Sequence, residues 1–63
     1  MELTTDYWRE RKLAGLTRVS YVGMSRTIDC PGIIKRVSSG VVHVLLNGDP
    51  TVSCFHPDDI RPR

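Results

Sequence analysis

The segment Val41-Val42-His43-Val44-Leu45-Leu46-Asn47-Gly48 carries the strongest signal for the fold. Its first six residues are aliphatic apart from one histidine, and the β-branched valines favour a strand over residues 41–46. The Asn-Gly pair that follows favours a tight hairpin turn. We therefore predict that residues 41–46 pair with a second strand over residues 51–55.

The sequence on either side of this hairpin predicts three more short strands, over residues 16–22, 33–37 and 60–61. A polar, turn-rich stretch over residues 23–32 separates the first two of them. Pro57 can begin a single helical turn over residues 57–59, because proline fixes the backbone at its entry. Short strands linked by tight turns are typical of a small barrel or sandwich.

The first fifteen residues predict a short helix. Thr4 or Thr5 can cap its first turn through the side-chain hydroxyl, and Gly15 suits the position after its end. A helix of this length is marginal in water on its own, so we expect it to pack against the strands. The chain is thus divided into an N-terminal helix, residues 1–15, and a small β domain, residues 16–63.

Three groups of residues carry a resemblance to a known family: Gly32-x-Ile34-x-x-Val37, Val42-x-Val44-x-Leu46, and Val52-x-Cys54 followed by residues 56–62. In their order and spacing they resemble the Src-homology-3-like small barrel in its KOW and Tudor-like variety. The resemblance implies a mainly β fold, a five-stranded small barrel, here preceded by a short N-terminal helix. Members of this family bind peptides, RNA, DNA or modified side chains, so the ligand stays open. Residues 8–16 are similar to segments of small phage and plasmid regulators, which implies an accessory protein.

Length and composition limit the classes of function. A domain of 63 residues has a thin core and little room for an enclosed pocket of the usual size, about 300 Å³ or more, which weighs against an enzyme. The net charge of +2 permits a nucleic-acid partner without requiring one. No apolar run approaches the length of a membrane span, and the charged N-terminus lacks the apolar region of a secretory signal. We expect a cytoplasmic protein with free thiols and no membrane partner.

The cysteines and histidines are the candidate residues for metal binding and catalysis. Cys30, His43, Cys54 and His56 are one conceivable zinc set, but the chain lacks the Cys-x-x-Cys pair of structural zinc sites. Cys30 with a histidine and Asp58 can be drawn as a triad, although nothing in the sequence orients it. We predict no metal, no cofactor, no catalytic residue and no enzymatic activity.

The alternation of the hairpin strands predicts an apolar surface patch. If Val42, Val44 and Leu46 point inward, their neighbours in residues 41–46 point outward. The same parity, carried into residues 51–55, sends Val52 and Cys54 inward and Phe55 outward. A patch of this kind needs a cover, which is either the N-terminal helix or a partner protein. The predicted partner face consists of Tyr7, Trp8, Val41, His43, Leu45 and Phe55.

Basic residues supply an alternative, a nucleic-acid site made of Arg18, Tyr21, Arg26, Lys35 and Arg36. Lys35 and Arg36 are adjacent on a predicted strand, so alternation sends them to opposite faces and they cannot serve one groove. We therefore predict a non-enzymatic protein-binding or regulatory accessory module. The alternative is an RNA- or DNA-binding module of the KOW or Tudor-like type, and a homo-oligomer stays open.

Overall fold

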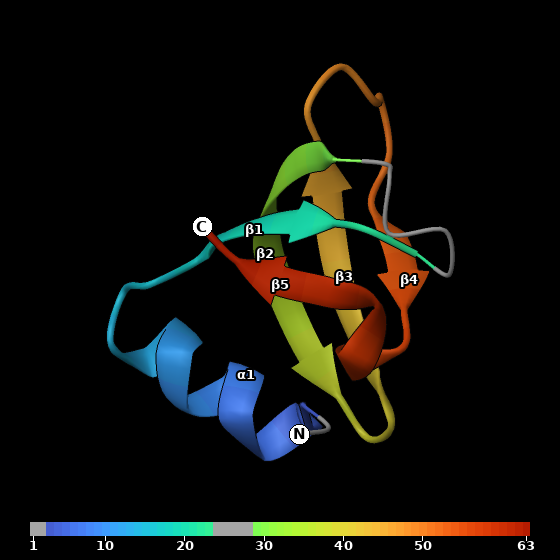
Figure 1. Cartoon of the computed structure of the whole chain (residues 1–63). Helices are drawn as coiled ribbons and strands as arrows, with labels where there is room; N and C mark the ends of the chain where they lie inside the picture. Colours follow the sequence, from blue (N-terminus) through green and yellow to red (C-terminus); the bar gives the residue numbers. More distant parts are fainter. Residues whose placement is uncertain (1–2, 24–28) are drawn as a thin grey trace.

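The computed structural model describes residues 3–23 and 29–63, and within them five strands form one antiparallel sheet (Figure 1). The order across the sheet is β4-β3-β2-β1-β5, so β4 and β5 are its two edges. The chain runs through α1 (Thr5–Leu13), β1 (Arg18–Tyr21), β2 (Cys30–Ser38), β3 (Val41–Leu46), β4 (Ser53–Phe55), the 3-10 turn η1 (Pro57–Asp59) and β5 (Ile60–Pro62). A mainly β fold with a short N-terminal helix is confirmed. The sheet is not closed across its edges in the described residues, so the expected barrel is confirmed only as this five-stranded sheet.

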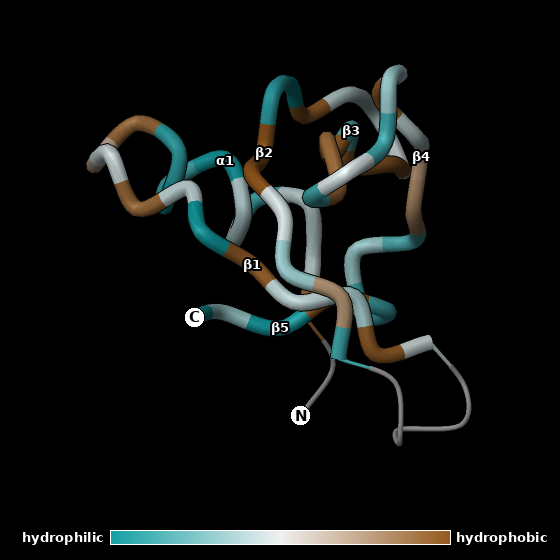
Figure 2. Tube along the Cα trace, turned by 90° about the horizontal axis from the view of Figure 1, so that it is seen from above, coloured by the Kyte–Doolittle hydropathy of each residue, from teal (hydrophilic) through white to brown (hydrophobic). Residues whose placement is uncertain are grey.

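The predicted hairpin joins β3 to β4. The amide of Asp49 donates a hydrogen bond of 3.0 Å to the carbonyl of Leu46, which closes the turn at Asn47 and Gly48. Gly48 has φ of +91°, a left-handed conformation that glycine adopts without strain. Figure 2 shows β3 as a largely apolar strand between β2 and β4. The fourth strand begins at Ser53, two residues later than predicted.

One face of the sheet, called the inner face below, carries the core. Val42 and Val44 are fully buried there, as the alternation of β3 predicts, and Leu46 packs against the same cluster. The opposite face is called the outer face. Among the described residues, the buried apolar side chains are Trp8, Val19, Ile34, Val42, Val44 and Ile60.

The predicted parity of β4 is wrong. Val42 pairs with Phe55 and His43 pairs with Cys54, so Phe55 lies on the inner face and Cys54 on the outer face. The Phe55 ring packs against Tyr21, with ring centroids 4.6 Å apart. The prediction carried alternation straight through the turn. Across a hairpin, the residues that share a face are those that pair, and even-numbered positions of β3 pair with odd-numbered positions of β4.

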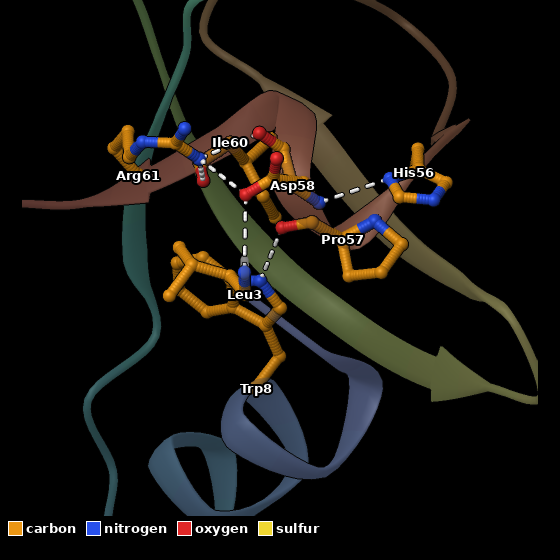
Figure 3. Close-up of polar contacts among 7 residues, drawn as sticks. All are labelled: Leu3, Trp8, His56, Pro57, Asp58, Ile60 and Arg61. Carbon is orange, nitrogen blue, oxygen red and sulfur yellow. Dashed lines mark hydrogen bonds and ion pairs between the residues drawn. The ribbon is translucent and has the colours of Figure 1, made fainter. Parts of the chain in front are cut away.

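The helix α1 is anchored by a single tryptophan. Its N-terminus is capped by Thr4, whose hydroxyl accepts a hydrogen bond from the amide of Tyr7, as predicted. Trp8 is completely buried in the core, and its indole N–H donates a hydrogen bond of 2.7 Å to the carbonyl of Pro57 (Figure 3). The amide of Leu3 donates to the carboxylate of Asp58 at 3.0 Å. These contacts tie the helix to η1, immediately before β5.

Strand parity in β3 can be tested with a pair of substitutions. We expect Val44→Asp to unfold the domain, because a carboxylate without a partner would replace a fully buried methyl face and cost several kcal/mol, roughly the whole stability of so small a domain. Val41→Asp should be much milder, since Val41 is only half-buried and lies on the outer face. Circular dichroism of the two variants makes the comparison, and equal damage from both would show that β3 is buried on two faces.

The anchoring role of Trp8 can be tested by urea denaturation. Trp8→Ala should lower the free energy of unfolding by about 3–5 kcal/mol, because it empties the largest space in the core. Trp8→Phe retains a ring but leaves the Pro57 carbonyl without its donor, and should cost about 1–3 kcal/mol. The control is Leu13→Ala, at a side chain that is 83% exposed on the same helix. An unfolding free energy for Trp8→Ala equal to that of the control would refute the anchor.

Candidate functional site

Charged, apolar and nucleophilic side chains lie on the outer face of the sheet in two rows that cross the strands. In the first row, Arg18 of β1 pairs with Ile33 of β2, which in turn pairs with Leu45 of β3. In the second row, Arg36 of β2 pairs with His43 of β3, which pairs with Cys54 of β4. The rows place basic, apolar and nucleophilic groups on one surface.

A β-bulge in β2 controls the charge of this surface. The register shifts between Ile34 and Arg36, so that Lys35 and Arg36 together lie opposite His43. Ile34 before the bulge is buried on the inner face, and Val37 after it packs against the core. The two residues between them therefore both point outward, and both are exposed. The prediction that Lys35 and Arg36 point to opposite faces is wrong, because the bulge interrupts alternation at this position.

Two C-terminal arginines extend the basic surface past β1. The Arg63 guanidinium donates to the Ser20 hydroxyl at 2.7 Å and to the Asp29 carboxylate at 2.9 Å. The Arg61 guanidinium lies 3.4 Å from the Asp58 carboxylate and donates to two backbone carbonyls at the end of η1 (Figure 3). Arg61 and Arg63 are thus held in place by neighbours. Within residues 3–23 and 29–63, no carboxylate pairs with Arg18, Lys35 or Arg36.

An open groove of about 410 Å³ runs along the first row. Its floor is apolar and includes Ile33, which is 46% exposed, and Leu45. Leu46, which also packs against the core, and Asp49 line the groove near the turn between β3 and β4. Arg18 and Arg63 line it beside this floor, and both also line a neighbouring hollow of about 250 Å³ toward the end of α1. The surface therefore combines an apolar strip with arginine side chains beside it.

A chain of polar contacts centres on His43 in the second row. Its Nε2 lies 3.0 Å from the Ser38 hydroxyl, and its Nδ1 lies 3.3 Å from the Cys54 sulfur. Cys54 is exposed, and the pairing of β3 with β4 brings it beside the imidazole. A thiol that contacts an imidazole nitrogen can transfer its proton to that nitrogen.

The predicted partner face does not assemble as one surface. Trp8 is buried in the core, Phe55 lies on the inner face, and Tyr7 stacks on Trp8 with ring centroids 4.9 Å apart. Only the β3 members of the set, Val41, His43 and Leu45, lie on the outer face. The Phe55 ring, which was predicted to lie in the outer patch, points toward the core.

Three of the predicted nucleic-acid residues share the outer face, namely Arg18, Lys35 and Arg36. Tyr21 does not, since its ring packs against Phe55 on the inner face. Arg26 lies outside the described residues.

Sequence reasoning missed several members of this surface. Ile33 could have been placed outward by its alternation with Ile34, whereas Arg61 and Arg63 join the face only through the pairing of β5 with β1. That pairing joins the two ends of the β domain, and no local signal encodes it. Nothing in the sequence indicated that Ser38 belongs to this surface.

The conceivable zinc set is not brought together in the described part of the chain, where no group of three metal-ligating side chains occurs. His43 and Cys54 are adjacent, but the His56 imidazole instead accepts a hydrogen bond of 3.1 Å from the amide of Asp58 at the start of η1. Cys30 is a half-buried free thiol at the start of β2.

The one α-helix described, α1, has nine residues, and no described helix is both long and apolar enough to cross a membrane. Comparison of the chain with protein-family models, with curated proteins and with solved structures gives no match.

Proposed function

We propose that this protein is a non-enzymatic binding module and that its outer face binds a strand of RNA or DNA. The observation that carries the proposal is the bulge in β2, which places Lys35 and Arg36 on the same face as Arg18. None of the three has a carboxylate partner in the described residues, so their charges are available to a ligand. Phosphate groups are the ligands that such cations neutralise, with release of counterions.

The spacing of these cations suits a chain of separate phosphates. Along β2, Lys35 and Arg36 lie two and three residues beyond Ile33, the partner of Arg18, which corresponds to roughly 7–10 Å of strand. Ile33 lies between its partner Arg18 and the bulge along β2, and with its other partner Leu45 it offers an apolar surface to the faces of bases. The outer face carries no Phe, Tyr or Trp ring among its described residues, so stacking would rest on the His43 imidazole and on the planar guanidinium of arginine.

The strand order also supports a finer proposal about the fold, the Src-homology-3-like small barrel of the KOW or Tudor-like variety. In this proposal the sheet curls around the inner face, and η1 joins the two edge strands β4 and β5. The bulge in the nine-residue strand β2 supplies the local twist that such curling needs.

A second candidate ligand is a peptide of a partner protein, favoured by the apolar groove and the exposed Ile33. The two candidates are separated by a pull-down from cell extract with and without nuclease. Loss of the captured material after nuclease treatment favours the nucleic acid, and its retention favours the peptide.

Charge-matched variants test the nucleic-acid proposal. The variant Lys35→Gln/Arg36→Gln should bind a fluorescent single-stranded oligonucleotide at least tenfold more weakly at low salt, as fluorescence anisotropy would report. Three or four phosphate contacts predict a slope of log K against log salt of about −2 to −3, and loss of two contacts should make it shallower by about 1.4. The control, Arg9→Gln/Lys12→Gln, removes the same formal charge from exposed positions of α1. Equal weakening by the control, or no binding by the unaltered protein at low salt, would refute the proposal.

A further inference from the structure

The Ser38–His43–Cys54 chain has the arrangement of an activated thiol. The imidazole of His43 contacts the Cys54 sulfur through Nδ1 at 3.3 Å and the Ser38 hydroxyl through Nε2 at 3.0 Å. When Nδ1 accepts the thiol proton, Nε2 carries a hydrogen that it can donate to the hydroxyl oxygen of Ser38. A nucleophile, a base and a group that orients the base are thus in contact on one exposed surface.

The positions of the three residues follow from strand pairing. Ser38 ends β2 at the turn into β3, His43 is the third residue of β3, and Cys54 is the residue of β4 that pairs with His43. Directly paired side chains on one face of a sheet are close neighbours. The imidazole is therefore held by the sheet itself, with one neighbour on each side.

Two cations of β2 lie beside this chain, next to His43. The bulge places Lys35 and Arg36 opposite His43, on the side away from Cys54 across β3. Their positive charge attracts reagents that carry carboxylates.

We propose that Cys54 is a modification site that undergoes thiol–disulfide exchange with small anionic disulfides of the glutathione disulfide class, with His43 as its base. The Cys54 proton passes to Nδ1 of His43, and the thiolate attacks one sulfur of the disulfide. The S–S bond of the reagent breaks while a new S–S bond joins Cys54 to one half of it. The other half leaves as a thiolate and takes up a proton, so that Cys54 is oxidised and the released thiol is reduced.

Cys30 provides an internal comparison. It is half-buried at the start of β2, and no hydrogen bond joins its sulfur to a histidine in the described residues. A metal does not account for the His43–Cys54 pair, because no third ligand lies near it in the described part of the chain. The proposal therefore concerns Cys54 alone, and it does not depend on the nucleic-acid proposal.

The test compares exchange rates in folded and urea-unfolded protein. Cys30→Ser leaves Cys54 as the single thiol, and Cys54→Ser leaves Cys30. Mass spectrometry follows the mixed disulfide formed with glutathione disulfide. Folded protein with Cys54 alone should react about tenfold faster than the same chain unfolded. A Cys54 thiol that was exposed but had no base beside it would react at the same rate in both states. Folded protein with Cys30 alone should react more slowly than its unfolded chain. A folded Cys54 that reacts no faster than the unfolded chain would overturn the proposal.

Further variants, made in the Cys30→Ser background, separate the effect of His43 as the base from the effect of Ser38, which positions it. His43→Gln should return the rate to that of the unfolded chain, and a rate that stays unchanged would refute the role of the base. Ser38 is a positioning residue, so Ser38→Ala should slow exchange and Ser38→Thr, which retains the hydroxyl, should restore it. Circular dichroism checks that each variant is folded, and the serine pair keeps the test decisive should His43→Gln unfold.

The charge of the reagent tests the role of the basic pair. After division by the rate of the unfolded chain, glutathione disulfide, an anion, should react faster than cystamine, a cationic disulfide of the same chemistry. Lys35→Gln/Arg36→Gln should remove this preference while His43 and Ser38 remain in place. An equal preference before and after the substitution would contradict the assignment of anionic disulfides as the reagent class.

Discussion

The burial of Trp8 is the interaction on which the arrangement depends. Its indole fills the core beneath the sheet, and its N–H satisfies the carbonyl of Pro57 in η1. Removing roughly 150–250 Å² of ring surface from water contributes about 4–6 kcal/mol, a large share of the stability of a small domain. This one contact fixes α1 and the turn that leads into β5. Because the helix contributes to the inner face, the outer face stays open.

The bulge in β2 then determines which charged side chains the outer face carries. Without the bulge in β2, alternation would send one of Lys35 and Arg36 toward the apolar inner face, where a charge without a partner is costly. With it, both charges lie in water beside His43. The basic surface and the Ser38–His43–Cys54 chain therefore share one structural cause, which is the register of β2, β3 and β4.

Much of the fold could be predicted from local signals. The Asn47-Gly48 turn, the buried Val42 and Val44, and the cap at Thr4 each follow from residue type and neighbours. The candidate site was harder to predict from the sequence, because strand pairing brings its members together. Alternation counted through a turn sends Phe55 to the wrong face, and alternation without the bulge sends Lys35 and Arg36 to opposite faces, although both lie on the outer face. Trp8 was predicted to lie on a surface, whereas it is the buried residue of α1, a helix whose apolar stripe is weak.

We propose that the inner face packs against Trp8 of the helix and that the outer face binds the ligand. Amide chemical-shift mapping of the isotopically labelled protein, titrated with a short single-stranded oligonucleotide at low salt, tests both parts at once. We expect shifts concentrated at Arg18, Ile33, Lys35, Arg36 and Leu45, with the amides of α1 unchanged. Shifts concentrated in α1, or none at a saturating oligonucleotide concentration, would contradict it.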